Sequence, residues 1–222
     1  MAVFNVVEKF VSINGEGTRA GQLAVFIRFA GCNLNCSYCD TAWANKQNTP
    51  AHSMTEFEIY DYIKATGVKN VTLTGGEPLL REDIDKLLRI LSSDGNIHVE
   101  IETNGSIDLS QFYDISDNIS FTVDYKLGGS GMEKYMLDEN FEDRRADDTV
   151  KFVVSDMADL ERARELIYRY SLTEKCNVYI SPVFGRIEPS QIVEYMKDNR
   201  MNGVNLQLQI HKIIWDPERK GV

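Results

Sequence analysis

The 222-residue sequence contains no apolar run that approaches the roughly 18 residues needed to span a bilayer. Its first nine residues mix apolar and charged side chains, so they do not form a secretory signal. The formal net charge is −10, which argues against binding of nucleic acid through a broad basic surface. Glycine and proline are scattered, so no linker indicates a second domain. These absences predict one cytoplasmic domain over residues 1–222 that binds neither membrane nor nucleic acid.

Cysteine is also scarce, with four in the chain, but three of them lie within eight residues. They are Cys32, Cys36 and Cys39, spaced C-x3-C-x2-C. Disulfides are disfavoured in a reducing compartment, and three neighbouring thiols would leave one unpaired. Three thiolates can instead hold three irons of a [4Fe–4S] cluster and leave the fourth iron open. A zinc site that adds His52, or inert buried thiols, are the alternatives. We expect the isolated Cys176 in the core.

Apolar, β-branched runs alternate with helical patterns along the chain. The predicted strands are 5–10, 23–29, 71–74, 98–102, 119–125, 149–154, 177–181 and 204–210. The predicted helices are 55–65, 81–92, 157–170 and 189–199, with a weaker one at 110–115. This alternation favours an α/β fold with a mostly parallel sheet. Because a complete eight-unit barrel takes about 250 residues, a partial β/α barrel of about six units fits this length better.

Unusual polar residues stand where five of the predicted strands end. They are Cys32, Cys36 and Cys39; Gly75, Gly76 and Glu77; Glu102, Thr103 and Asn104; Asp124 and Lys126; and Ser181 and Pro182. In β/α barrels the active site is built at the C-terminal ends of the strands. The five segments are therefore predicted to converge on one mouth.

The cysteine spacing, with Tyr38 before the last cysteine, resembles the signature of the radical SAM superfamily. Thr74–Pro78 reads TGGEP and is similar to that superfamily's GGE motif, although Gly75-Gly76 alone would indicate a tight turn. The resemblance implies a partial barrel of the radical SAM type, a [4Fe–4S] cluster on the three cysteines, and S-adenosylmethionine (SAM) on the open iron. The SAM-binding residues that it implies are Tyr38, Asp40, Gly75, Gly76, Glu77, Glu102, Asn104, Asp124, Lys126, Ser181, Pro182 and Phe184.

Further segments resemble one family, the 7-carboxy-7-deazaguanine synthases of queuosine and deazapurine biosynthesis. Ser12–Gly17 reads SINGEG and is similar to the family's S-x-Q-G-E-G, with Asn14 in place of the usual Gln. The lead-in 26–32, the triplet CDT at 39–41 and QIHK at 209–212 also match. The resemblance implies radical conversion of 6-carboxy-5,6,7,8-tetrahydropterin to 7-carboxy-7-deazaguanine with loss of ammonia. SAM would be regenerated, and a homodimer, Mg²⁺ and an electron donor such as flavodoxin are implied.

The family match also implies roles for particular side chains. The implied substrate-binding residues are Ile13, Asn14, Gly15, Glu16, Arg28, Thr74 and His211, and Thr41 would ligate Mg²⁺. Arg28 suits a carboxylate because its planar fork can bind both oxygens; the alternative is a surface ion pair. Glu16 suits ring N–H groups, unless its segment is only a turn. Thr41 could be a turn hydroxyl and His211 a structural residue.

Two other functions stay open on the sequence. A glycyl-radical activating enzyme of the same superfamily would share the cysteine loop, act on a partner protein and need an open docking face. A non-enzymatic zinc-binding interaction module would use the same cysteines. The glutamate at position 16 together with Arg28 favours a small polar carboxylate substrate over both.

Overall fold

A single curved sheet organises the computed structural model, which describes residues 1–46 and 48–222. The strands are β1 (Val3–Ile13), β2 (Leu23–Phe29), β3 (His52–Thr55), β4 (Asn70–Gly75), β5 (His98–Thr103), β6 (Ile119–Tyr125), β7 (Thr149–Val154), β8 (Asn177–Pro182) and β9 (Val204–Leu206). Their order is β3-β1-β2-β4-β5-β6-β7-β8-β9. From β2 to β9 the neighbours are parallel, whereas β1 is antiparallel to β2 and β3. The sheet is therefore an open partial barrel, and the predicted α/β class is confirmed.

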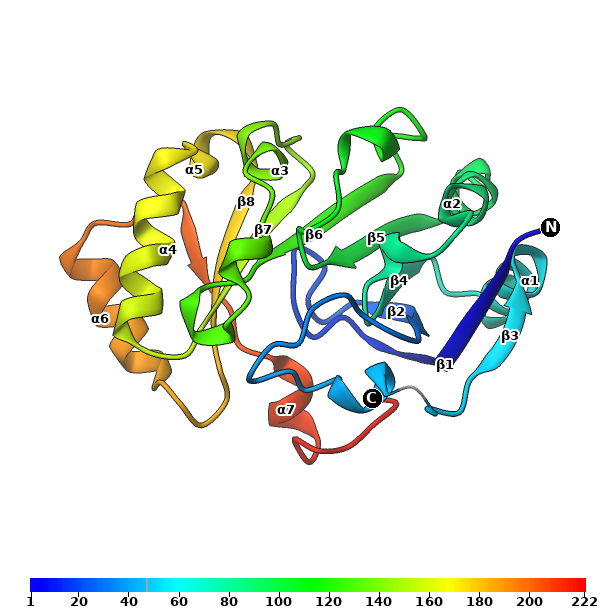
Figure 1. The fold of residues 1–222 in the computed structure, drawn as a ribbon, viewed down its shortest axis with the longest axis horizontal. Coiled ribbons are helices and arrows are strands. Elements are labelled where there is room, and N and C mark those ends of the chain that lie inside the picture. The colour runs from blue at the N-terminus through cyan, green and yellow to red at the C-terminus, as the bar shows by residue number, and fades with distance from the viewer. Residues whose placement is uncertain (47) are drawn as a thin grey trace.

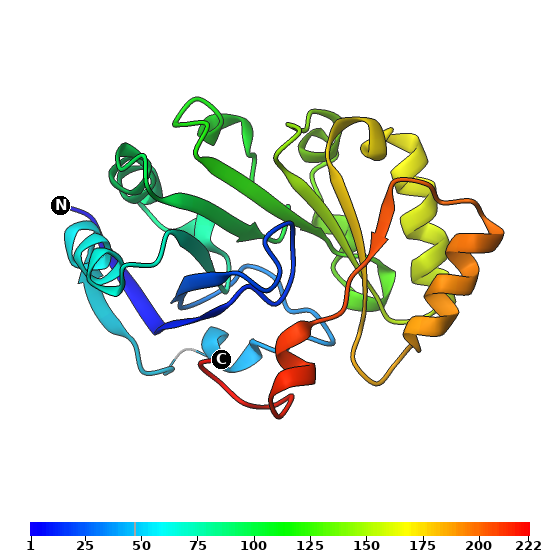
Figure 2. The ribbon, with the colours of Figure 1, turned by 180° about the vertical axis from the view of Figure 1, so that it is seen from behind.

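Seven α-helices accompany the sheet in the described residues, and most of them lie at its two ends. They are α1 (Glu56–Thr66), α2 (Ile84–Ser93), α3 (Glu139–Glu142), α4 (Met157–Arg169), α5 (Leu172–Lys175), α6 (Pro189–Asp198) and α7 (Ile210–Ile214). Figures 1 and 2 place α1 and α2 at one end, α4 to α6 at the other, and α7 apart from both groups. Within the described residues, no helix is long and apolar enough to cross a membrane.

Local sequence signals account for many of the element boundaries. The predicted strands 23–29, 119–125 and 149–154 appear with those bounds. Thr55 caps α1: its hydroxyl accepts from the Glu58 N–H, and the Glu58 carboxylate accepts from the Thr55 N–H. Gly67 ends the helix with a φ of 70°, which glycine adopts at little cost.

The predicted strand 204–210 is wrong beyond Leu206. Its alternating pattern continues, but the Ile210 N–H donates to the Gly15 carbonyl (3.1 Å), so the chain leaves the sheet edge and forms α7. The predicted helix at 81 starts three residues later, after Asp83 with φ of 61°. The short strand β3 and the helix α7 were not predicted.

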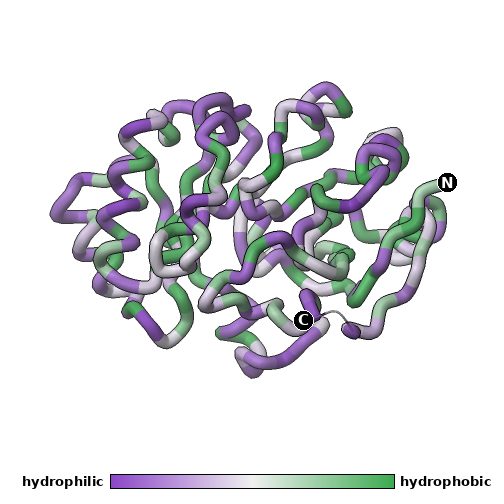
Figure 3. Tube along the Cα trace, in the orientation of Figure 1, coloured by the Kyte–Doolittle hydropathy of each residue, from purple (hydrophilic) through white to green (hydrophobic). Residues whose placement is uncertain are grey.

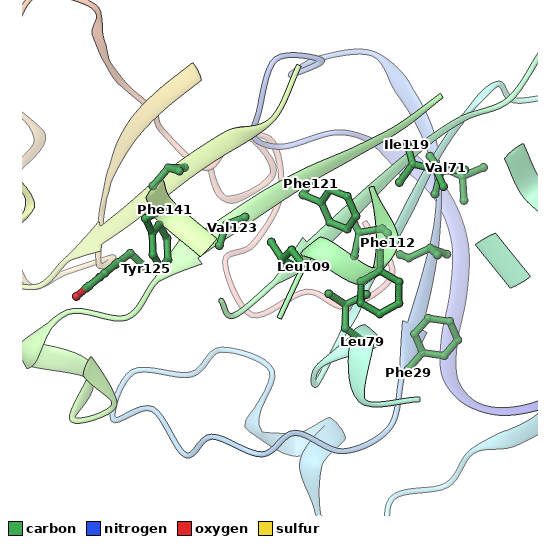
Figure 4. Close-up of a cluster of buried hydrophobic side chains, with 14 of the residues drawn as sticks. Phe29, Val71, Leu79, Leu109, Phe112, Ile119, Phe121, Val123, Tyr125 and Phe141 are labelled. Carbon is green, nitrogen blue, oxygen red and sulfur yellow. The ribbon is translucent and has the colours of Figure 1, made fainter. Parts of the chain in front are cut away.

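The two faces of the sheet differ in polarity because successive side chains of a strand alternate. On β6, Phe121, Val123 and Tyr125 join the apolar core beneath the helices, and Figure 4 shows the cluster that they form with Phe29. Ser120, Thr122 and Asp124 lie on the opposite face, which we call the inner face. Figure 3 shows hydrophilic and hydrophobic residues interspersed along the Cα trace. Polar groups buried on the inner face need partners, since unpaired ones cost several kcal/mol.

Candidate active site

The three cysteines lie on a loop that we call the cysteine loop (residues 31–40). The loop is held at several points: Gly31 N–H donates to the Ala44 carbonyl (3.2 Å) and Ser37 N–H to the Ser130 carbonyl (3.0 Å). The Ser37 hydroxyl donates to the Gly129 carbonyl at 2.7 Å. All three thiols are partly exposed, so the loop presents them at a surface instead of enclosing them in the core.

A buried carboxylate fixes the segment that holds the cysteine loop. Asp159, 3% exposed, accepts from the Gly129 N–H (2.8 Å), the Ser155 N–H (2.9 Å) and the Ser155 hydroxyl (2.7 Å). A Cβ at Gly129 would lie 2.1 Å from the Ser155 Oγ, so only glycine fits there. Sequence reasoning missed Asp159, although the run Gly128-Gly129-Ser130-Gly131 was a signal of a close backbone approach.

The donors around Cys32 suit a ligand sulfur. The Leu34 N–H lies 3.4 Å and the Asn104 side-chain amide 3.6 Å from the Cys32 sulfur. Hydrogen bonds of this kind stabilise cluster thiolates and tune their potentials. Burial raises the pKa of Cys36, and the nearby charge of Lys126 partly offsets that rise. The donor set therefore fits an iron–sulfur cluster on this loop.

The predicted zinc alternative finds less support. That alternative adds His52 to the three cysteines. His52 lies exposed on the edge strand β3. Cys176 is partly buried against the core, where its pKa rises to about 11 because of burial.

The two glycines of the TGGEP segment allow β4 to approach the cysteine loop. A Cβ on Gly76 would lie 1.8 Å from the Gly31 carbonyl oxygen, and one on Gly75 would lie 2.4 Å from the Phe29 backbone. The Glu77 N–H also donates to the Gly31 carbonyl (3.0 Å). These glycines therefore have a packing role that is independent of any ligand.

Glu77 has different partners from those expected. Its side chain is fully buried and accepts from the Asn104 N–H (2.7 Å), the Thr103 hydroxyl (2.9 Å) and the Leu79 N–H (3.1 Å). Burial raises the pKa of Glu77, while these hydrogen bonds oppose that rise. Glu77 thus joins the ends of β4 and β5 and orients Asn104 toward Cys32. Its contact with SAM stays a prediction.

The inner face carries a second set of paired polar groups. The Thr74 hydroxyl donates to Glu102 (2.6 Å), Thr122 donates to Glu100 (2.6 Å), and Thr72 donates to the Asn14 side chain (3.0 Å). Burial and the like charge of Glu102 raise the pKa of Glu100 to about 7. Sequence reasoning missed Glu100, although the alternation in the segment HVEIET indicates that its two glutamates share a face.

Glu16 lies among residues from β7 and β8. Its carboxylate is 3.2 Å from the Lys151 ammonium and accepts from the Ser181 hydroxyl at 3.3 Å. Thus the predicted substrate residue Glu16 and the predicted SAM residue Ser181 do meet. Lys151 was missed by sequence reasoning, because a lysine within a strand is ordinarily a solvent-facing residue.

Asp124 and Lys126 form an ion pair of 2.8 Å at the end of β6. The second oxygen of Asp124, Oδ1, is buried and lacks a hydrogen-bond partner among the described residues. Buried acceptors of this kind are ordinarily satisfied, so this atom fits a ligand hydroxyl such as those of the SAM ribose. Tyr38 reaches the same region and donates its hydroxyl to the Val153 carbonyl (3.1 Å). Pro182 is partly exposed and Phe184 is 63% exposed, at the outer rim.

Arg28 is neither a free guanidinium nor a surface ion pair. Its Nε donates to Glu8 on the neighbouring strand β1 at 2.9 Å, and both side chains are about four-fifths buried. An ion pair through Nε fixes the side chain and still allows the terminal nitrogens of the fork to bind a carboxylate. The prediction that Arg28 binds substrate stays a prediction.

The C-terminal segment 210–222 lies across the predicted mouth. A Cβ on Gly15 would lie 2.5 Å from the ring of His211 on α7, so the two predicted substrate residues are in close contact. Lys212 is 3.5 Å from Asp40, and the Lys220 ammonium lies 4.0 Å from the centre of the Trp43 ring. Asp40 also accepts from the Thr41 hydroxyl at 2.9 Å. Burial lowers the pKa of His211.

Comparisons with known proteins agree with this site. The family model described as the Radical SAM superfamily matches residues 26–124. A 7-carboxy-7-deazaguanine synthase of Clostridium acetobutylicum is 59% identical over 219 residues, which is 99% of either chain. Another, from Chlorobaculum tepidum, is 35% identical over 226 residues, covering 100% of this chain and 98% of the relative.

A solved structure extends the agreement to the fold. QueE from Escherichia coli superposes with a TM-score of 0.74 at 23% identity, covering 93% of this chain and 94% of that chain. The radical SAM resemblance is therefore confirmed, and with it the [4Fe–4S] cluster and SAM that this superfamily uses. With near-complete coverage at 59% identity and the cysteine loop in place, the chain belongs to the 7-carboxy-7-deazaguanine synthase family.

Proposed function

We propose that this protein converts 6-carboxy-5,6,7,8-tetrahydropterin to 7-carboxy-7-deazaguanine with loss of ammonia, as a radical SAM carbon–nitrogen lyase. The observation that carries the proposal is the meeting of Glu16, Lys151 and Ser181 on the polar inner face, beside a cysteine loop of the radical SAM type. A small polar heterocycle suits this face, because its N–H groups can donate to a carboxylate that is already held in place.

Cys32, Cys36 and Cys39 would hold the [4Fe–4S] cluster, with Asn104 and Leu34 donating to the first sulfur. When bound, the reduced cluster and SAM supply a carbon radical that removes a hydrogen atom from the substrate. Lys126 would bind the SAM carboxylate and the free oxygen of Asp124 a ribose hydroxyl. The remaining predicted SAM residues are assigned to the same proposed SAM site: Tyr38, Asp40, Gly75, Gly76, Glu77, Glu102, Ser181, Pro182 and Phe184.

Glu16 would accept from the ring N–H groups of the pterin, and the Arg28 fork would bind its carboxylate. Asn14 supports this assignment, because it is 3% exposed and its Nδ2 lacks a partner among the described residues. His211 lies against Gly15 and would close the pocket from the C-terminal side. Ile13 and Thr74 complete the proposed substrate contacts.

We assign Mg²⁺ to the neighbourhood of Thr41, whose hydroxyl lies beside Asp40. Mg²⁺ keeps several waters and is commonly bridged to substrate oxygens, so binding should depend on the pterin. A one-electron donor such as flavodoxin, a homodimer and a cytoplasmic location complete the proposal. We also infer a single domain over residues 1–222, because every strand of the described chain joins one sheet.

A glycyl-radical activating enzyme is the rival function, and such an enzyme needs an open docking face for its partner protein. Here the C-terminal segment covers the mouth through Lys212 on Asp40 and Lys220 on Trp43. This coverage favours a small-molecule substrate.

The test is an anaerobic reaction of reconstituted protein with reductant, SAM, Mg²⁺ and 6-carboxy-5,6,7,8-tetrahydropterin, followed by mass spectrometry. We expect 7-carboxy-7-deazaguanine, and its loss in Cys36→Ala. Cys176→Ala is the matched control, because that thiol lies against the core away from the loop. SAM cleavage without deazaguanine would turn the assignment to the activating-enzyme rival. A protein that holds its cluster and forms neither product would refute the proposal.

A further inference from the structure

Lys151 on β7 lies between two carboxylates that belong to different predicted ligand sites. Its ammonium is 3.2 Å from Glu16, which is assigned to the pterin, and 3.8 Å from Asp124, which is assigned to SAM. The Lys151 side chain is only 10% exposed. Lys151 belongs to neither the predicted SAM-binding residues nor the predicted substrate-binding residues.

The four charges form an alternating row across the inner face. From the β1–β2 loop the row runs through Glu16, Lys151, Asp124 and Lys126. Burial alone would lower the pKa of Lys151, but Glu16, Asp124 and Glu102 raise it above its ordinary value. Because removing one partner of a buried pair leaves an uncompensated charge, each member of this row constrains the next.

We propose that Lys151 is a positioning residue that couples the pterin site to the SAM site. Its ammonium would hold the Glu16 and Asp124 carboxylates in fixed positions relative to each other. The inference rests on the proposed function. The two carboxylates depend on Lys151 to different degrees. Asp124 has a second cation, Lys126, at 2.8 Å, whereas the other partner of Glu16 is the neutral Ser181 hydroxyl. Removing the ammonium should therefore disturb the pterin site more than the SAM site.

Coupling through a shared residue has a measurable signature. If each ligand fixes one end of the row, then each should bind more tightly when the other is present, by the same factor. Loss of Lys151 should remove that factor as well as weaken each affinity, whereas a residue that only supports the fold would lower stability and leave the factor unchanged.

The test uses the cluster-loaded enzyme and two probes, SAM and 6-carboxypterin, the oxidised and unreactive analogue of the substrate. Dissociation constants are measured for each probe alone and in the presence of the other, by equilibrium dialysis for SAM and by fluorescence for the pterin. In Lys151→Met we expect the 6-carboxypterin dissociation constant to rise about tenfold or more, the SAM constant to rise less, and the coupling factor to fall toward one. Lys151→Arg, which keeps the positive charge, should retain most of the affinity for both probes and most of the coupling factor.

A matched control separates positioning from stability. Arg144 is also buried and charged, with a 1% exposed side chain 3.9 Å from Asp148, and Asp148 lies just before β7 begins. Arg144→Met should lower the melting temperature without changing either dissociation constant. Should Lys151→Met fail to keep its cluster, Lys151→Gln gives the same comparison with a polar side chain.

Unchanged affinities and an unchanged coupling factor in the Lys151 variants would overturn the inference and leave the proposed function intact. A wild-type holoenzyme that binds SAM but not 6-carboxypterin would instead overturn the proposed function, and the coupling with it.

Discussion

The two halves of the active site are built in different ways. The half around the cysteine loop and the end of β4 is fixed by close backbone contacts, as between Gly76 and Gly31, and by buried carboxylates that accept from backbone N–H groups, as Asp159 does from Gly129. The half at the ends of β6 to β8 is fixed by charged side chains, as in the pairs of Lys151 with Glu16 and of Lys126 with Asp124. The close backbone contacts leave no space for an added side-chain atom, whereas charged side chains can respond to ligands and to pH. The division suits a permanently held cluster on one side and exchanging ligands on the other.

The largest expected effect is that of a single methyl group in the backbone-built half. In Gly76→Ala the new Cβ would lie 1.8 Å from the Gly31 carbonyl oxygen, so the cysteine loop must move. We expect the variant to lose most of its iron and its activity, as measured by iron per chain and by visible absorbance. Gly95→Ala is the control, since a Cβ there meets nothing within 4 Å. Iron content equal to that of the wild type would contradict the packing role.

On the inner face beside the charged half, stability should depend on pH through Glu100 on β5. Its pKa in the fold is about 7, above the ordinary value of 4.5, so the unfolded chain releases this proton first as pH rises. Stability should therefore fall between about pH 4.5 and pH 7, by roughly 3 kcal/mol in total.

Glu100→Gln tests this directly, because it keeps an acceptor for the Thr122 hydroxyl and cannot ionise. Urea unfolding at pH 5 and pH 8 should show that the variant is more stable than wild type at pH 8 and similar at pH 5. Substitution of the exposed Glu174 by Gln should leave the profile unchanged. A wild-type profile that is retained in Glu100→Gln would assign the dependence to other groups.

A smaller effect is expected for substitution of Asp159, whose carboxylate holds the segment that contacts the cysteine loop. Asp159→Asn places an amide where the carboxylate accepts N–H groups of Gly129 and Ser155. Leaving a buried donor unpaired costs about 1–3 kcal/mol, so urea unfolding should show a loss in that range. The brown absorbance of the cluster should also decay faster in air. Asp147→Asn, at an exposed position, is the control. If the absorbance decays equally fast in both variants, Asp159 does not stabilise the cysteine loop.

The sequence predicted the cysteine loop and most strands because their signals are local. The cysteine spacing lies within eight residues, and runs such as Ile119–Tyr125 are apolar and β-branched on their own. The missed residues act at long range. Lys151 is 135 residues from Glu16, and Asp159 is 30 residues from Gly129. The partners of Glu77 could not be predicted either, since the Asn104 N–H reaches it only after β4 and β5 have paired.

The prediction of a strand over 204–210 was wrong beyond Leu206 for the same reason, a contact between residues far apart in the sequence. Its alternation is genuine, but the hydrogen bond of Ile210 to Gly15 decides where the chain goes. The alternation in HVEIET did carry information about the inner face, because it places Glu100 and Glu102 on one side of β5.

The position of the chain's last residues has a practical consequence. In Figures 1 and 2 the C-terminus lies beside the short helix at residues 42–45, below the middle of the sheet, with Lys220 over the Trp43 ring, whereas the N-terminus lies at the β3–β1 end of the sheet. A purification tag or fusion partner attached after Val222 would therefore lie close to the cysteine loop and Trp43, and one attached before Met1 would lie away from them.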